Sequence, residues 1–226
     1  MGNGDSLEES SGAEVLIAAA FTTSYFDDKK AVQRARSALD TSASVKTEIR
    51  DRYLTPVIAV SRLIADTIRN GGKILFCGNG GSAADSQHLA TEFVVRLSAK
   101  RDRQALPAVA LTTDTSTLTA AGNDFGFERI FARQVEALGA SGDVLIVFST
   151  GGTSPNIIKA LEVARERKLT TVGFLGSHIE TMAPLLNHII SVPSKDTNRI
   201  QESHITLGHI MVDLVECDLF GYPSGE

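Results

Sequence analysis

Short apolar runs alternate with segments of helical periodicity from Lys73 to the end of the chain. Five runs have the length and apolar character of buried strands, and they span residues 73–77, 108–112, 144–148, 171–175 and 188–192. The segments between and after them predict helices at about 83–97, 127–138, 155–168 and 199–219. Strands that are apolar almost throughout and alternate with helices are typical of a parallel sheet with helices on both faces. The sequence therefore predicts an α/β fold built on a doubly wound parallel sheet.

The N-terminal part of the chain has a different pattern. Residues 1–12 are rich in glycine, serine and acidic residues, and we expect them to form a disordered tail. Apolar residues between Leu54 and Ile68 recur near helical spacing, and Asn70-Gly71-Gly72 would end that helix. We therefore expect residues 13–70 to form a helical segment and residues 71–226 to form the α/β domain.

Composition narrows the classes of function. The chain has 226 residues and a formal net charge of −5, which argues against nucleic-acid binding because that function normally needs a basic face. No apolar run approaches the ~18 residues of a membrane-spanning helix. The two cysteines, Cys77 and Cys217, lie far apart and lack metal-ligand spacing. We expect a cytoplasmic protein with free thiols that does not bind membranes.

Ligands of doubly wound sheets bind at the carboxyl ends of the strands. This rule selects the expected loops at 78–82, 113–124, 149–154 and 193–200. The first of these is Gly78-Asn79-Gly80-Gly81-Ser82, in which glycines would let the backbone approach an anion. Ser82 and Asp85 resemble a capping box, which would start a helix beside the loop. A tight strand-to-helix connection without any ligand explains this one loop equally well.

The second candidate loop runs from Ser149 to Asn156 and follows another apolar strand. Ser154 is a suitable N-cap, and Pro155 is a suitable first residue of a helix. Several hydroxyl groups beside a helix N-terminus suit a phosphate monoester. Two such loops after separate strands therefore predict a site for phosphate or a sugar phosphate.

His88 and Glu92 stand four residues apart on an expected helix and so share one face. The pair is either a surface ion pair or a pair for proton transfer or metal binding. The last expected helix adds Gln201 and His209, the latter within an apolar segment. A histidine in such a segment is often a hydrogen-bonded structural residue, so its role stays open on these grounds alone.

Four motifs in this order resemble those of the sedoheptulose 7-phosphate isomerases, or phosphoheptose isomerases, of the sugar isomerase (SIS) superfamily. They are GNGGSAADSQH followed by Glu92, ALTTDTS with AGNDFGF, GDVLIVFST, and RIQESHITLGHI, and the resemblance extends from about residue 40 to Gly221. It implies a five-stranded parallel sheet flanked by helices. It also implies that the N-terminal helices build a homotetramer with active sites between subunits.

The resemblance implies an isomerase that converts sedoheptulose 7-phosphate into glycero-manno-heptose 7-phosphate through an enediol. This is the first step towards the ADP-heptose used in lipopolysaccharide and other heptose-bearing glycans. Glu92 and His209 would be the acid/base residues. Zinc, where present, would be held by His88, Glu92, Gln201 and His209. Substrate contacts would come from Asn79, Gly80, Gly81, Ser82, Asn123, Asp124, Ser149, Thr150, Gly151, Ser154 and Gln201.

The chain departs from the family pattern at one position. The family usually has Ser-Thr-Ser-Gly where this chain has Ser149-Thr150-Gly151-Gly152. Gly151 therefore lacks a hydroxyl that would face the phosphate. Loss of one such hydrogen bond costs on the order of 1 kcal/mol, or several-fold in affinity. The departure leaves open a different sugar phosphate as substrate, or impaired activity.

The implied zinc ligands raise a geometric question. Gln201 and His209 are eight residues apart, which is about 12 Å of rise on a regular helix. Both cannot easily reach one ion at ~2 Å from a single straight helix. Either Gln201 precedes the regular helix, or the ligands come from different subunits. A further alternative is a non-catalytic SIS-domain protein that binds another protein, but such relatives lack the residues that match Glu92 and His209.

Overall fold

The computed structural model describes residues 24–222 and divides the chain into two compact units, Met1–Thr41 and Ser42–Glu226. The predicted tail at residues 1–12 lies outside the described residues. Helix α2 (Asp28–Arg52) crosses the division between the units, and α3 (Leu54–Arg69) follows it within the second unit. Helix α3 ends at Arg69 with Asn70 as its C-cap, and the following Gly71 has a φ of +80°. The boundary that we predict at residue 70 stays a prediction.

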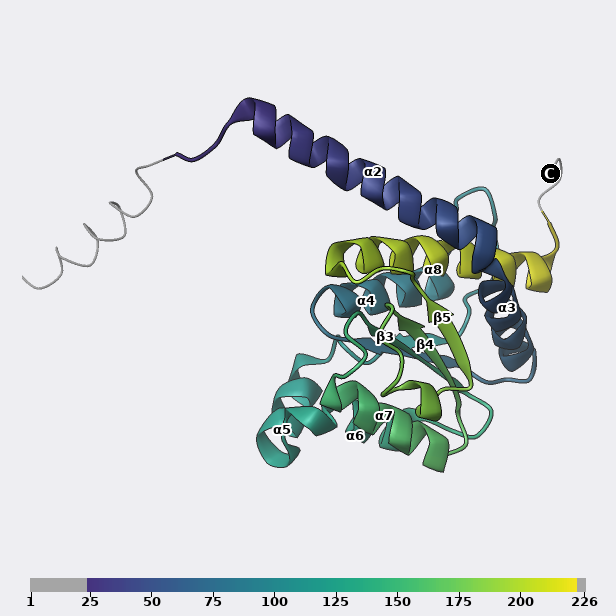
Figure 1. Cartoon of the computed structure of the whole chain (residues 1–226). Coiled ribbons are helices and arrows are strands. Elements are labelled where there is room, and N and C mark those ends of the chain that lie inside the picture. The colour runs from purple at the N-terminus through teal and green to yellow at the C-terminus, as the bar shows by residue number, and fades with distance from the viewer. Residues whose placement is uncertain (1–23, 223–226) are drawn as a thin grey trace, which may run out of the picture. The chain divides into compact units, whose positions relative to one another are not determined.

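The second unit is built on a five-stranded parallel sheet with the strand order β2-β1-β3-β4-β5 (Figure 1). The predicted fold class is confirmed, and every predicted strand is present within a few residues of its expected bounds. The strands are β1 (Ile74–Gly78), β2 (Ala108–Ala110), β3 (Val144–Ser149), β4 (Thr170–Leu175) and β5 (His188–Ser191).

Helices cover both faces of this sheet (Figure 1). Helices α3, α4 (Gly81–Val94) and α8 (Thr197–Phe220) contribute to one buried cluster. Helices α5 (Thr115–Phe125), α6 (Ile130–Leu138) and α7 (Pro155–Glu166) contribute to the other. Two short 3-10 helices, η1 (Phe127–Arg129) and η2 (Ala183–Leu185), complete the described elements.

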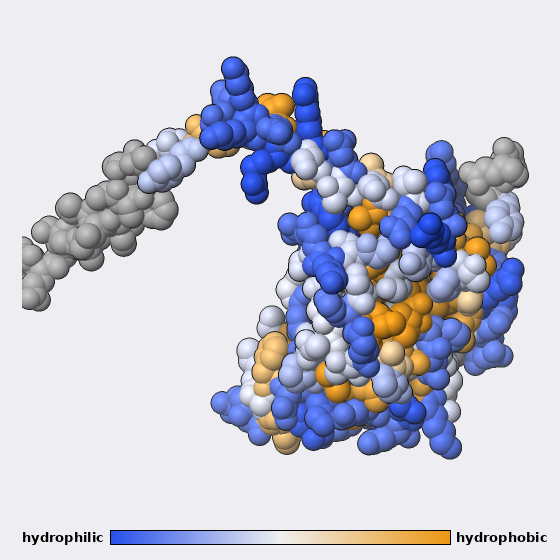
Figure 2. Space-filling view, viewed as in Figure 1, coloured by the Kyte–Doolittle hydropathy of each residue, from blue (hydrophilic) through white to orange (hydrophobic). Residues whose placement is uncertain are grey.

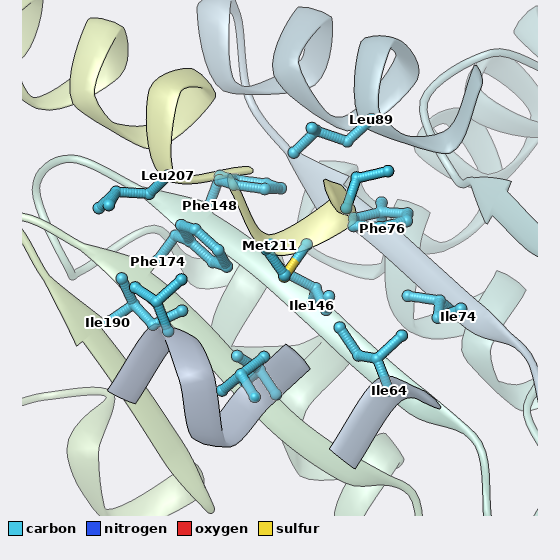
Figure 3. Close-up of a cluster of buried hydrophobic side chains, with 14 of the residues drawn as sticks. Ile64, Ile74, Phe76, Leu89, Ile146, Phe148, Phe174, Ile190, Leu207 and Met211 are labelled. Carbon is cyan, nitrogen blue, oxygen red and sulfur yellow. The ribbon is translucent and has the colours of Figure 1, made fainter. Parts of the chain in front are cut away.

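Alternate residues of the buried strands enter the two clusters. In β1, Phe76 packs in the first cluster and Leu75 in the second. Figure 3 shows Phe76, Phe148 and Phe174 from neighbouring strands under Leu89 of α4 and Leu207 of α8. Continuous apolar strands are therefore needed here, because both faces of the sheet are covered.

Two of the predicted loops are partly helical. Residues 113–124 are not a loop, because α5 begins at Thr115 and Asp114 caps it by accepting a hydrogen bond from the Thr117 backbone N–H at 3.0 Å. The threonine-rich start of α5 lacks apolar periodicity, so the sequence pattern does not predict this helix. The loop predicted at 193–200 is shorter than expected, because α8 begins at Thr197 with Asp196 as its N-cap.

Among the residues that the structure describes, no helix has both the length and the apolar character to span a membrane.

Candidate active site

The first glycine turn joins β1 to α4. Helix α4 begins at Gly81, and its N-cap is Gly80 with a φ of +55°. The predicted capping box at Ser82 and Asp85 is therefore wrong: Ser82 is the second residue of the helix and is buried. A Cβ at Gly78 would lie 2.6 Å from the Ser82 carbonyl oxygen, so the strand can meet the helix this closely only through glycine. The turn places the positive end of α4 at the carboxyl edge of the sheet.

The second turn joins β3 to α7. Ser149 is buried, and its hydroxyl accepts a hydrogen bond from the Gly152 backbone N–H at 3.1 Å. Gly152 has a φ of +67°, and a Cβ there would lie 2.1 Å from the His178 carbonyl oxygen. Ser154 occupies the N-cap position as predicted, but its side chain makes no capping hydrogen bond. Its hydroxyl is thus not committed to the helix. Thr150 is half-buried, and Gly151 is exposed.

A pair of asparagines ties the two turns together. The amide of Asn79 donates to Asn156 Oδ1 at 2.9 Å, and the amide of Asn156 donates back to Asn79 Oδ1 at 2.8 Å. Sequence reasoning missed Asn156, which is buried in the first turn of α7. The available signal was a polar amide placed just inside a helix, after both the N-cap and the proline. The two turns lie side by side because β1 and β3 are adjacent in the sheet.

Two histidines and one glutamate meet between α4 and α8. His88 Nε2 lies 2.7 Å from His209 Nε2 and 3.2 Å from Glu92 Oε1. The potential ligand atoms of the three residues all lie within 4.8 Å of one another. The His88 side chain is 50% exposed and that of Glu92 is 16% exposed, so the cluster reaches the surface of the unit at His88 while Glu92 is mostly buried. Two imidazole nitrogens and one carboxylate oxygen form a donor set that fits zinc.

This meeting depends on a close approach of the two helices. A Cβ at Gly208 would lie 2.5 Å from Leu89 Cδ1. Gly208 precedes His209, and Leu89 follows His88. The absent side chain at Gly208 thus allows the two imidazole rings to come into contact.

The surroundings favour a neutral imidazole at His209. Burial lowers the pKa of His209, and the neighbouring His88 lowers it further, while Glu92 opposes both effects. A neutral imidazole can accept a proton or bind a metal ion.

One turn before His88, burial raises the pKa of Asp85 to about 6, and its Oδ2 is buried without a hydrogen-bond partner. The sequence pattern alone indicates only a capping role for Asp85.

Gln201 lies eight residues before His209 in the chain. It belongs to the regular helix α8, so the alternative in which it precedes the helix is wrong. A Cβ at Gly81 would lie 2.7 Å from both Nε2 and Oε1 of Gln201, which places its amide against the first glycine turn. Gln201 therefore contacts the turn within its own chain, while His209 lies about 12 Å further along the helix.

Asn123 and Asp124 lie in the last turn of α5. The Asn123 amide donates to Asp124 Oδ1 at 2.8 Å. Within the part of the chain that the structure describes, their side-chain hydrogen bonds join them to each other and not to either glycine turn. Their predicted substrate contacts stay a prediction.

Comparison with known proteins identifies the family. The SIS domain family matches residues 39–176, more than half of the chain. A phosphoheptose isomerase from Maridesulfovibrio salexigens is 50% identical over 192 residues, covering 85% of this chain and 91% of that relative. A phosphoheptose isomerase from Burkholderia pseudomallei is 53% identical over 171 residues, covering 76% and 86%. The chain belongs to the phosphoheptose isomerase family.

Solved structures of phosphoheptose isomerases share the fold. The one from Neisseria gonorrhoeae superposes with a TM-score of 0.76 at 42% identity, covering 81% of this chain and 97% of that chain. The one from Francisella tularensis gives a TM-score of 0.78 at 34% identity, covering 82% and 97%. The resemblance carried by the four motifs is thereby confirmed. Because phosphoheptose isomerases are enzymes, the enzymatic interpretation is favoured over the non-catalytic alternative.

Proposed function

We propose that the chain interconverts sedoheptulose 7-phosphate and glycero-manno-heptose 7-phosphate. The observation that carries this proposal is the contact of His88 and Glu92 on α4, which begins at the first glycine turn, with His209 on α8, in a chain of this family. His88 lies seven residues after Gly81, which is roughly 10 Å along α4. The substrate carries its phosphate on C7 and reacts at C1 and C2. A phosphate held near the turns would thus leave the reacting carbons free to reach the cluster.

Ketose–aldose isomerisation moves one proton between C1 and C2 and adjusts the protons on O1 and O2. We assign the carbon proton to the carboxylate of Glu92 and the oxygen protons to His209. The lowered pKa of His209 keeps its imidazole neutral and ready to accept a proton near neutral pH. The mostly buried Glu92 side chain is shielded from water, which would otherwise compete for the proton.

His88, Glu92 and His209 would hold zinc, with Gln201 as the fourth ligand. A bound zinc ion would polarise the substrate carbonyl as a Lewis acid. The position of Gln201 against the turn of its own chain supports a ligand set assembled from different subunits. A carboxylate bound to zinc is a weaker base, so Glu92 would have to alternate between the two roles, or the metal would chiefly organise the site.

A homotetramer with sites between subunits is part of this proposal. The half-exposed His88 leaves room for a second subunit to complete the site. Figure 2 shows apolar side chains at the surface of the Ser42–Glu226 unit. An apolar hollow of about 160 Å³ is lined in part by Leu54, Leu207 and Ile210. The product would feed ADP-heptose and lipopolysaccharide synthesis in the cytoplasm.

Direct assay of the purified protein tests the proposal. We expect it to convert sedoheptulose 7-phosphate to the aldose, and we expect Glu92→Gln to abolish turnover because an amide cannot take the carbon proton. A panel of ketose phosphates with shorter carbon chains would show whether the departure at Gly151 accompanies a different substrate. Turnover of another ketose phosphate alone would reassign the substrate. Absence of turnover with every member, at full zinc occupancy, would favour a binding protein.

A further inference from the structure

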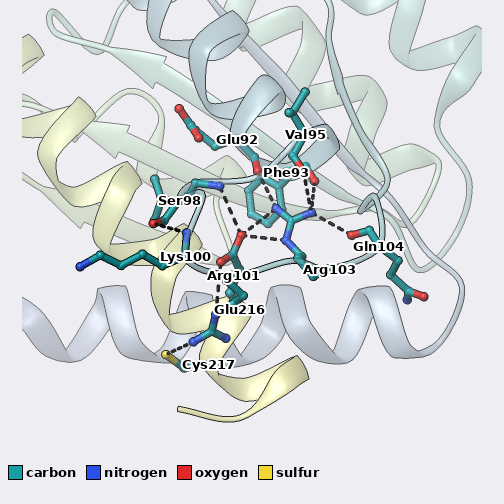
Figure 4. Close-up of polar contacts among 11 residues, drawn as sticks. Glu92, Phe93, Val95, Ser98, Lys100, Arg101, Arg103, Gln104, Glu216 and Cys217 are labelled. Carbon is teal, nitrogen blue, oxygen red and sulfur yellow. Dashed lines mark hydrogen bonds and ion pairs between the residues drawn. The ribbon is translucent and has the colours of Figure 1, made fainter. Parts of the chain in front are cut away.

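Arg103, in the segment between α4 and β2, caps the C-terminal end of α4. Arg103 donates hydrogen bonds to the main-chain carbonyls of Glu92 at 2.7 Å and Phe93 at 2.8 Å (Figure 4). Carbonyls in the last turn of a helix have no partner within the helix. The Arg103 side chain is 1% exposed, so this cap lies inside the protein.

The same guanidinium binds a buried carboxylate on the other helix of the site. Arg103 Nη2 lies 2.7 Å from Glu216 Oε1, and Arg103 Nε donates to that oxygen at 2.8 Å. Glu216 belongs to α8 and is 2% exposed. Arg101 Nε lies 3.7 Å from Glu216 Oε2, and the Leu97 backbone N–H donates to Glu216 Oε1 at 3.4 Å.

These contacts join the two helices that carry the catalytic cluster. One nitrogen, Arg103 Nη2, bonds both the main chain of Glu92 and the carboxylate of Glu216. Glu216 stands seven residues after His209, two turns along the same face of α8. The close contact of Gly208 with Leu89 fixes the two helices at one point, and the Arg103–Glu216 pair fixes them at a second. Two fixed points define both the spacing and the rotation of the helices.

We infer that Arg103 and Glu216 are positioning residues that hold the carboxylate of Glu92 in register with His209. This inference rests on the proposed function of that cluster. A buried ion pair is weak evidence for a role in stability, because desolvation offsets most of its attraction. The direct bond to the backbone of Glu92 supplies a geometric role instead. A misplacement of about 1 Å at a reacting group can lower a rate by ~10²-fold.

The test compares this pair with a second buried carboxylate that lies away from the site. Asp143 is 2% exposed, pairs with Lys73, and accepts hydrogen bonds from the backbone N–H groups of Lys73 and Ala140. Both Lys73 and Asp143 precede strands, so they lie at the amino edge of the sheet. Glu216→Gln, Arg103→Lys and the control Asp143→Asn would each be measured for melting temperature, kcat, KM and Co²⁺ affinity.

We expect Glu216→Gln and Arg103→Lys to lower kcat at least ~10-fold with KM changed by less than about 2-fold, because the glycine turns are untouched. Co²⁺ affinity, followed by visible absorption, should fall by ~10–100-fold, as for other groups that orient metal ligands. Asp143→Asn should lower the melting temperature while leaving kcat and Co²⁺ affinity within about 2-fold. Equal losses in Asp143→Asn, or wild-type kcat and Co²⁺ affinity in Glu216→Gln, would overturn the inference.

The two proposals can fail separately. If the wild-type protein binds Co²⁺ without isomerising the sugar, the proposed function is wrong, and the Co²⁺ affinities of the variants still decide the positioning role. If Glu216→Gln does not fold, the double variant Arg103→Met with Glu216→Met replaces the charges by an apolar pair of similar size. Such replacements often preserve stability. A folded double variant with wild-type kcat would equally overturn the inference.

Discussion

Gly151, the position in the second turn where the family usually has serine, is surrounded by open space. A Cβ at Gly151 would meet no atom within 4 Å, and the backbone there does not have a positive φ. A serine would therefore fit without strain. The adjacent Gly152 is the opposite case, because its φ is +67° and a Cβ would lie 2.1 Å from the His178 carbonyl oxygen. A serine substitution at Gly151 can therefore be compared with the same substitution at Gly152 as its control.

We predict that Gly151→Ser lowers KM for the sugar phosphate several-fold with little change in kcat, because one added hydrogen bond is worth about 1 kcal/mol. Inhibition by inorganic phosphate should strengthen by the same factor. Gly152→Ser should instead lower both stability and activity. An unchanged KM and an unchanged phosphate inhibition constant in folded Gly151→Ser would show that residue 151 does not face the phosphate.

His204 gives a pH dependence that can be isolated. It is fully buried between Phe148 and Phe174, and its Nε2 lies 3.2 Å from the Leu175 carbonyl oxygen. Burial lowers the pKa of His204 from 6.5 to about 4. His204 therefore becomes protonated below pH 6.5 in the unfolded chain, but only below about pH 4 in the folded chain. Stability due to this residue is complete above pH 6.5 and falls as the pH decreases to 4.

We predict that the free energy of unfolding of the wild type falls by roughly 3 kcal/mol more than that of His204→Gln between pH 7 and pH 4, since each unit of pKa difference is worth about 1.4 kcal/mol. Urea unfolding at several pH values measures this difference. Asp85, whose pKa is raised to about 6, contributes with the opposite sign, but it is common to both proteins and cancels. Parallel curves for the two proteins would contradict the prediction.

At the scale of elements, a close approach of two helices decides the geometry of the site. Gly208 of α8 lies against Leu89 of α4, beside the two histidines. Gly122 of α5 is also a helical glycine, but a Cβ there would meet only Ile130 Cγ2, at 3.8 Å. The same substitution should therefore have opposite effects in the two helices.

We predict that Gly208→Ala destabilises the protein by about 1–3 kcal/mol through overpacking and weakens Co²⁺ binding by moving His209 away from His88. Gly122→Ala should stabilise it by about 0.5–1 kcal/mol, because alanine is favoured in helices. Thermal unfolding and Co²⁺ titration measure both effects. Unchanged Co²⁺ affinity in Gly208→Ala would show that the helices adjust without moving the histidines.

Sequence patterns predicted the strands and most helices well, since buried strands and amphipathic helices leave periodic signals. They missed α5, whose start is capped by Asp114 and carries threonines in place of an apolar stripe. In the site, the spacing of His88 and Glu92 indicated a shared face. The roles of Asn156 and Arg103 could not be predicted, because each depends on a contact between segments distant in the sequence.

At the scale of the whole molecule, the two compact units differ in what they can bury. The first unit, Met1–Thr41, includes the beginning of α2, and its described residues contain one helical stretch without a second element to pack against. Isolated helices of this length are marginal in water. An additional chain would supply the missing contacts, as expected if these helices build an oligomer. The Ser42–Glu226 unit carries both buried clusters and the residues proposed for catalysis, so it should fold without the first unit.

Removing the first unit therefore tests whether assembly completes the site. We predict that the full chain has about four times its 24.1 kDa mass in solution, and that a variant beginning at Ser42 is a smaller species that melts cooperatively but lacks isomerase activity. A control that begins at residue 24 retains all of α2 and should keep both the mass and the activity. Analytical ultracentrifugation and the isomerase assay measure the two properties on the same samples. Full turnover by a demonstrably monomeric species would mean that one chain holds the whole site, and Gln201 would then bind substrate at the turn instead of sharing a metal ion with His209.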